Sequence, residues 1–304
     1  MSFTEQVKNE LARIPREDAG SRAAELLALL RMSGSFITGA HASWGLEFST
    51  GNSAVARRVL VYLKKDFGFM PSTMVRQGRR LRKKNVYTLL VQPSKEGLHF
   101  LDTIGLSPLS GAEDMEKLVT AEERRAYLAG AFLGGGSVSR PQSDYHLEMV
   151  TQSARFAEEI VKAMKSFRLN ARLTDRKNDY IVYIKDGDEV SEFLQIVGAA
   201  QSYMDFESVR VVKDMRNRVH RQVNCETANL QKTVDAAVRQ THLVQKLLAK
   251  ESRSSLSPKI REACDLRLAH PNASLSELAE ICGITKSGLA HRFQKSEAME
   301  GTAD

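Results

Sequence analysis

The sequence predicts an α+β fold, in which two αββαββα-type repeats are followed by an all-α domain. Two observations lead to this fold class. Matching helix and strand patterns recur about 100 positions apart over the first two thirds of the chain, and only helical patterns follow them. A repeat of this length indicates two similar subdomains around a pseudo-twofold axis, because solenoid repeats are roughly 20–50 residues long.

The composition is that of a basic protein without a metal-binding pattern. The 304 residues leave room for two or three domains, and a net charge of +7 favours a polyanion such as nucleic acid as partner. Three scattered cysteines and seven histidines without metal-binding spacing predict no metal and no other cofactor. Few cysteines also fit a reducing cytoplasm. The sequence shows no apolar run long enough to span a bilayer, so no membrane partner is expected.

The first predicted repeat covers residues 1–110. Periodic apolar residues predict its helices and strands, and Gly34–Phe36 is expected to close the second helix. The expected helices are Phe3–Ile14, Arg22–Met32, Asn52–Phe67 and Ser94–Ile104, and the expected strands are Leu46–Ser49, Thr73–Arg76 and Val86–Gln92.

The second predicted repeat covers residues 111–205. Leu147–Thr151 matches Leu46–Thr50, 101 positions earlier, and strands are expected at Ala171–Thr174 and Tyr180–Ile184. In each repeat a helix rich in Leu, Ala or Gly ends in Gly-Ser and an apolar residue. The second of these helices has Gly130 and Gly134 one turn apart. Small residues at this spacing allow two helices to pack backbone to backbone.

These two helices resemble degenerate copies of the LAGLIDADG motif of homing endonucleases. In that family an acidic residue before Gly-Ser in each helix holds a divalent metal for phosphodiester cleavage. The matching positions are Ser33 and Gly135, and the upstream acid position is Arg31 in one copy and Leu133 in the other. None of these residues binds a metal as a carboxylate does. The resemblance therefore implies the scaffold without the enzyme, and a metal-dependent endonuclease is the less favoured alternative.

A basic segment, Arg76–Lys84, falls between two predicted strands of the first repeat. In the homing-endonuclease fold such strands form a saddle on DNA, so basic residues at this tip would contact phosphates without sequence choice. The alternative is a solvated hairpin tip. The matching turn of the second repeat, Asp175–Asp179, is nearly neutral, so any contact should be asymmetric. The possible phosphate contacts here are Arg76, Arg79, Arg80, Arg82, Lys83 and Lys84.

Residues 206–256 are predicted to be a basic junction and a linker helix. Arg216, Arg218 and Arg221 are further possible phosphate contacts. The helix is expected from about Thr227 to Lys250, either packed on the terminal domain or acting as a spacer.

Residues 257–304 are predicted to form a helix-turn-helix domain. Ser274 and Glu277 have the spacing of a capping box, Gly283 suits the turn, and Thr285 can cap the second helix. A basic, polar outer face on that helix suits the major groove, and the alternative is a helical hairpin with a solvated basic face. The candidate DNA-binding residues are Ser274, Thr285, Lys286, Ser287, His291, Arg292 and Lys295.

The combination resembles one family, WhiA, a bacterial regulator of sporulation and cell division. The resemblance covers nearly the whole chain and includes Met215–Asn229 at the domain junction. It implies a non-enzymatic transcriptional regulator in cell division, chromosome segregation or sporulation, bound to double-stranded DNA at the nucleoid in the cytoplasm. The alternative is an interaction module in cell division, whose LAGLIDADG-like domain binds a protein partner while DNA contact is incidental.

Overall fold

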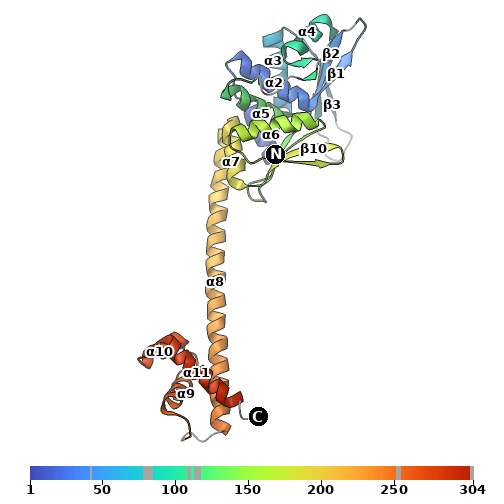
Figure 1. Ribbon diagram of the computed structural model, residues 1–304. Coiled ribbons are helices and arrows are strands. Elements are labelled where there is room, and N and C mark those ends of the chain that lie inside the picture. Colours follow the sequence, from blue (N-terminus) through green and yellow to red (C-terminus); the bar gives the residue numbers. More distant parts are fainter. Residues whose placement is uncertain (42, 78–84, 108–110, 113–117, 251–254, 302–304) are drawn as a thin grey trace. The chain divides into compact units, whose positions relative to one another are not determined.

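A computed structural model describes residues 1–304 except 42, 78–84, 108–110, 113–117, 251–254 and 302–304. The chain forms two compact units, Met1–Lys213 and Asp214–Asp304. The first contains two antiparallel four-stranded sheets and their helices, and the second is helical (Figure 1). The expected α+β fold class is confirmed.

The first repeat follows the αββαββα plan. Its elements are α1 (Phe3–Leu11), α2 (Ala19–Ser33), β1 (Gly34–Thr38), β2 (Trp44–Thr50), α3 (Ser53–Phe67), β3 (Ser72–Gln77), β4 (Asn85–Ser94) and α4 (Lys95–Thr103). Helix α2 does end at Gly34, but Ser35 and Phe36, which were expected to close it, belong to strand β1. A Cβ on Gly34 would lie 2.6 Å from the Leu30 carbonyl oxygen, so glycine permits the helix to pass directly into the strand.

The second repeat has the same plan and the same strand order. The sheets run β1-β2-β4-β3 and β7-β8-β10-β9. The two halves of the first unit share one strand order, as expected from the sequence match at an offset of 101 positions. The elements that follow α4 are β5 (Leu106–Ser107), β6 (Gly111–Ala112), α5 (Ala121–Gly135), β7 (Gly136–Val138), β8 (Leu147–Thr151), α6 (Ala154–Ser166), β9 (Arg172–Arg176), β10 (Asp179–Ile184) and α7 (Gly187–Val197).

Helices α2 and α5 pack against each other at the centre of the first unit. A Cβ on Gly130 would lie 2.1 Å from the Glu25 carbonyl oxygen, and one on Gly134 would lie 2.4 Å from Met32 Cβ. The two backbones can approach this closely only because these positions lack side chains. At the C-terminal ends of the helices, Ser33 Oγ donates a hydrogen bond to the Gly134 carbonyl oxygen at 3.2 Å.

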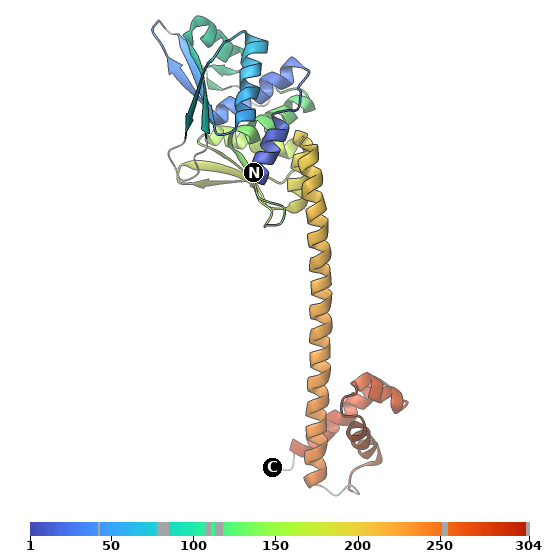
Figure 2. The same ribbon diagram turned by 180° about the vertical axis from the view of Figure 1, so that it is seen from behind.

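The helices cover one face of each sheet. Leu46 and Phe48 on β2 are buried beneath them, as are Leu147 and Met149 on β8. Figure 2 shows α3 lying along the sheet of the first repeat. The alternate residues of the same strands face away from the helices, because successive side chains on a strand point to opposite faces. We call the two faces opposite the helices the saddle.

Helix α8 (Ala200–Lys250) is continuous over 51 residues. It begins well before the expected start near Thr227, because the segment contains no Gly or Pro to end a helix. Its first turns belong to the first unit, where Ser202 Oγ donates to Glu10 Oε2 at 2.6 Å and Phe206 is fully buried.

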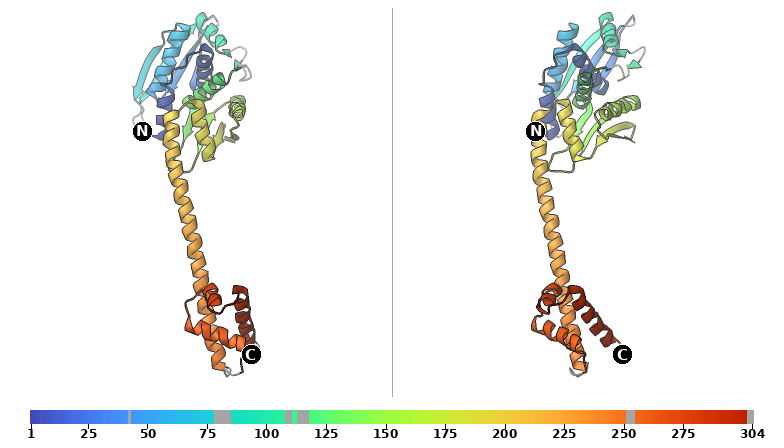
Figure 3. Two further views of the ribbon diagram at one scale, coloured as in Figure 1. Left: turned by 90° about the vertical axis from the view of Figure 1, so that its left-hand side faces the viewer. Right: turned by 60° about the vertical axis from the view of Figure 1, so that its left-hand side comes forward.

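The second unit has its own hydrophobic core. Its helices are α9 (Pro258–Ala269), α10 (Leu275–Ile281) and α11 (Lys286–Gly301), and they surround the last turns of α8 (Figure 3). Val244 and Leu247 of α8 are buried in this core, so it draws on residues upstream of the expected domain start at 257. No described helix combines the length and the apolar character that crossing a membrane requires.

Candidate nucleic-acid interface

The turn between α10 and α11 is built from the local signals that the sequence contains. Ser274 Oγ accepts a hydrogen bond from the Glu277 amide at 3.2 Å, and Glu277 Oε2 accepts one from the Ser274 amide at 2.7 Å. Gly283 has a φ of +64°, a value that L side chains rarely adopt. Thr285 Oγ1 accepts a hydrogen bond from the Gly288 amide at 3.1 Å. These bonds satisfy one backbone amide in the first turn of each helix and hold the corner.

The first turns of α11 present polar side chains to solvent. Leu289 and Phe293 are buried, so the helix has an inner face in the core. Lys286 and Lys295 form no ion pair with a carboxylate in the described part of the chain. The outer candidates that are exposed are Thr285, Lys286, Ser287, His291 and Lys295, while Ser274 is partly buried at the start of α10.

Arg292 lies differently from the other candidates on α11. Its guanidinium donates to Glu262 Oε2 at 2.6 Å and to the Lys259 carbonyl at 3.4 Å, and 16% of its side chain is exposed. Arg292 thus fastens α11 to α9, and a contact with a base would require this ion pair to open. Sequence reasoning placed Arg292 on a face without acids because Glu262 approaches only in the folded unit.

Arg267 of α9 is a positioning residue that sequence reasoning missed. It is 1% exposed, and its guanidinium donates to Gln240 Oε1 at 2.6 Å and to the Ala273 carbonyl at 2.6 Å. Burial lowers the pKa of this guanidinium. The hydrogen bonds tie the segment before α10 to helix α8 and so orient the helix-turn-helix.

The basic residues of α8 do not share one face. Arg218 and Arg221 are three positions apart and lie on one side of the helix, whereas Arg216 points elsewhere. All three are exposed. They form a scattered positive charge rather than a stripe that would follow a DNA backbone.

Two carboxylates lie at equivalent places on the saddle. Glu47 on β2 and Glu148 on β8 are 101 positions apart, and both side chains face away from the helices. Glu148 accepts a hydrogen bond from Ser137 Oγ at 3.1 Å and lies 3.1 Å from His146 Nε2. Carboxylates here repel phosphate. Sequence reasoning missed them, although the repeat match contains both residues.

The basic tip of the first repeat is described only at its start. Arg76 on β3 is exposed, and its Nε lies 3.1 Å from Met74 Sδ. The remaining candidates, Arg79, Arg80, Arg82, Lys83 and Lys84, lie outside the described residues, so their phosphate contacts stay a prediction.

The two degenerate acid positions do not fit a divalent metal. Ser33 donates its hydroxyl to the Gly134 carbonyl, and a Cβ on Gly135 would lie 2.7 Å from the Val150 carbonyl oxygen and 2.8 Å from Met32 Sδ. Close packing therefore requires glycine at position 135, the place where the LAGLIDADG motif carries an acidic metal ligand. Among the described residues, no group of three or more His, Cys, Asp or Glu side chains could hold a metal ion.

The upstream acid position of the first motif carries Arg31, which has a structural partner. Arg31 forms an ion pair with Glu159 of α6 and donates to the Tyr127 hydroxyl at 2.9 Å. Both charged side chains are nearly buried, with 6% and 5% exposed. Burial raises the pKa of Tyr127, so its hydroxyl stays protonated and donates to Glu159 at 2.9 Å. A position that carries an acid in the homing-endonuclease motif here joins the two repeats.

The first repeat contains a similar buried network that uses some of the equivalent positions. Glu25 of α2 accepts hydrogen bonds from Arg58 Nε at 2.8 Å and from the Tyr62 hydroxyl at 3.2 Å. Glu25 occupies the place of Tyr127, and Arg58 occupies the place of Glu159, 102 and 101 positions apart. The network around Glu25 takes all three groups from the first repeat, whereas the network around Glu159 takes Tyr127 from the second repeat and Arg31 from the first.

The protein is thus of the class that joins two LAGLIDADG-like repeats to a helix-turn-helix unit, here with Ser33 and Gly135 at the places of the metal ligands. Three family profiles match the chain: the WhiA N-terminal LAGLIDADG-like domain at residues 19–107, the WhiA LAGLIDADG-like domain at 124–216 and the WhiA C-terminal HTH domain at 219–300. The chain belongs to the WhiA family.

Named relatives and solved structures agree with this assignment. The "Probable cell division protein WhiA" of Alkaliphilus metalliredigens is 41% identical over 98% of this chain and 97% of its own length. The protein of the same name from Thermoanaerobacter sp. is 39% identical over the same shares. The crystal structure of full-length WhiA from Thermatoga maritima matches 99% of both chains with a TM-score of 0.59 at 22% identity, which shows the fold.

Proposed function

We propose that this protein is a DNA-binding regulator that does not cleave DNA. It acts at the nucleoid as a WhiA-like transcriptional regulator in cell division, chromosome segregation or sporulation. The observation that carries the proposal is the exposed outer face of α11, whose lysines form no ion pair with a described carboxylate. The relatives named as probable cell division proteins support the biological role.

In this proposal α11 enters the major groove by its first turns. Thr285, Lys286 and Ser287 lie there, next to free backbone amides whose partial positive charge favours phosphate. Lys286 then contacts a base edge or a phosphate, and His291 lies about one turn beyond Ser287 on the same helix. The helix-turn-helix corner is held by the hydrogen bonds of Ser274 and Thr285 and by the positive φ of Gly283.

The absence of cleavage follows from Ser33 and Gly135 at the places of the metal ligands. Ser33 is bonded to a carbonyl oxygen, and a side chain on Gly135 would collide with strand β8. No proton or metal chemistry can be assigned to either residue.

A second role is proposed for the saddle. Glu47 and Glu148 oppose a phosphate backbone, while exposed strand β9 carries Arg172 and Arg176 at its edge. A mixed surface of this kind suits a protein partner better than DNA, and such a partner would connect the DNA-bound protein to cell division.

The proposal is tested with the full chain and fluorescent promoter fragments. We expect specific binding at physiological salt and uncut DNA after incubation with magnesium. Truncation before the helix-turn-helix is the poorer test, because it would expose Val244 and Leu247 of α8. Cut DNA would support the endonuclease alternative. Equal affinity for promoter and scrambled fragments would contradict the proposal of a sequence-specific regulator.

A further inference from the structure

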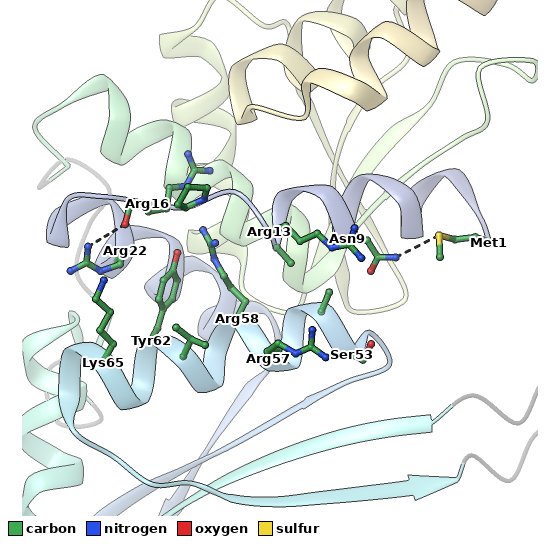
Figure 4. Close-up of a pocket in the computed structure, with 14 residues that line it drawn as sticks. Met1, Asn9, Arg13, Arg16, Arg22, Ser53, Arg57, Arg58, Tyr62 and Lys65 are labelled. Atoms are coloured by element: carbon green, nitrogen blue, oxygen red, sulfur yellow. Dashed lines mark hydrogen bonds between the residues drawn. The ribbon is translucent and has the colours of Figure 1, made fainter.

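The first unit contains a pocket lined by basic residues on its helical side. The pocket lies between α3 and the segment formed by α1 and the chain that follows it, with a cavity volume of about 550 Å³. Figure 4 shows α3 between this pocket and the strands of the first sheet, so the pocket is separate from the saddle. Its cationic residues are Arg13, Arg16, Arg22, Arg57, Arg58 and Lys65.

These six cations have two carboxylate partners among the described residues. Arg22 pairs with Asp66, with Nη2 2.8 Å from Oδ1. Arg16 and Arg58 share Glu25, at 2.9 and 2.8 Å. The excess of six cations over two carboxylates is four positive charges.

Three of the cations are exposed and form no ion pair in the described part of the chain. Arg13 follows α1, while Arg57 and Lys65 lie on α3. The pocket walls themselves contain no Asp or Glu. An anion that enters the pocket would therefore meet side chains that need not first release a carboxylate.

The inner end of the pocket is held by a buried network. Glu25 is fully buried and Arg58 is 8% exposed. Arg58 also donates to the Ile14 carbonyl, and Arg16 Nη2 donates to the Val197 carbonyl at 3.4 Å. Because these bonds already fix both guanidinium groups, binding would cost little side-chain entropy.

Part of the wall is apolar. Ala12, Pro15, Ala54 and Val61 line the pocket beside the cations, and Val61 is 48% exposed. A ligand with one multiply charged end and one apolar or planar end fits such a wall. The volume lies within the roughly 300–1,000 Å³ of small-molecule sites.

We propose that this pocket binds a small molecule carrying two or three linked phosphates, of the nucleoside diphosphate or triphosphate class. A single phosphate carries about −1.5 to −2 charges at neutral pH, which would leave the pocket positive. Linked phosphates match the excess of four, and arginines bind phosphate oxygens through pairs of N–H donors. The site is independent of the DNA contact proposed for α11.

The test is calorimetric titration of the full chain with pyrophosphate and with ADP at about 0.15 M salt. The test variant is Arg13→Gln with Arg57→Gln, since both side chains are exposed and free of described ion pairs. The control is Lys232→Gln with Arg239→Gln, two exposed residues of α8 that are not among the candidate phosphate contacts, and it removes the same charge elsewhere. We expect one site per chain, a loss of at least about 10-fold in the test variant, and a change below about twofold in the control.

Three results would overturn the proposal. They are no saturable binding up to about 1 mM ligand, more than one ligand per chain, or equal weakening in the test variant and the control. A short DNA duplex separates the two sources of phosphate. If the duplex displaces pyrophosphate and the test variant binds DNA more weakly than the control, the pocket contacts the DNA backbone and the small-molecule proposal fails.

Discussion

The central helices and saddle of the first unit differ from the outer face of α11 in the charges that they place where DNA contact was considered. In the LAGLIDADG-like unit Arg31 and Arg58 are buried and paired with carboxylates, and the saddle carries Glu47 and Glu148. In the helix-turn-helix unit Lys286 and Lys295 are exposed, without a described ion pair. This difference supports the proposal that DNA contact lies on α11, so mutations at these places in the two units should change different quantities.

Removing the buried charge of the first repeat should have the largest effect. Glu25→Gln leaves Arg16 and Arg58 without their shared carboxylate, at 12% and 8% side-chain exposure. Breaking a buried ion pair in this way costs about 3–5 kcal/mol. We expect urea unfolding to show this loss. Glu159→Gln is the matched variant in the second repeat, and its loss should be smaller because one of its partners, Arg155, is 58% exposed.

A methyl group at the helix crossing should have the next largest effect. Gly130→Ala places a Cβ against the backbone of α2, so the two central helices must separate, at about 1–3 kcal/mol. The first repeat has Ala28 at the equivalent place, and Ala28→Gly should cost only about 0.5–1 kcal/mol. Equal losses in urea unfolding would contradict the close crossing at Gly130.

Two substitutions on α11 should separate a loss of DNA affinity from a loss of stability. Lys286→Ala should weaken binding to promoter DNA by about 1–3 kcal/mol and leave the unfolding free energy unchanged, because the side chain is exposed. Arg292→Ala should lower the unfolding free energy by about 1 kcal/mol, because it removes the ion pair with Glu262. Anisotropy and urea unfolding on both variants decide this. A stability loss in the lysine variant, or none in the arginine variant, would contradict the different roles given to Lys286 and Arg292.

A further difference concerns the pH dependence of stability in the first unit. Burial lowers the pKa of Lys8 from 10.5 to about 8, with its ammonium 5.8 Å from the Phe132 ring centre. Between these values the unfolded chain binds the proton and the folded chain does not, so this group makes stability rise with pH. Relative to Lys8→Met, the wild type should gain about 2 kcal/mol from pH 7.5 to 10. A flat difference would mean that Lys8 stays charged.

The sequence predicted those features that depend on residues close together in the chain or on the absence of a side chain. The capping box at Ser274, the turn at Gly283 and the close packing at Gly130 depend on neighbouring residues or on the absence of a side chain. The repeat was visible because two strands kept similar residues 101 positions apart. Strands β1 and β7 were missed because each is short and follows a helix without a loop.

Contacts between distant residues could not be predicted in this way. Arg31 and Glu159 are 128 positions apart, and Arg292 meets Glu262 only after three helices have packed. The pairing removes Arg292 from the group of free cations on α11. Sequence patterns therefore identified the unit that carries the candidate interface more accurately than the individual side chains within it.

The most direct measurement compares the DNA affinity of three full-length proteins by fluorescence anisotropy at two salt concentrations. They are the wild type, Lys286→Ala on α11 and Arg172→Ala on the saddle, two variants that each remove one exposed cation. We predict that Lys286→Ala weakens specific binding by about 5-fold or more and that Arg172→Ala leaves it unchanged. The reverse result would place the DNA contact on the saddle and contradict the division of roles between the two units.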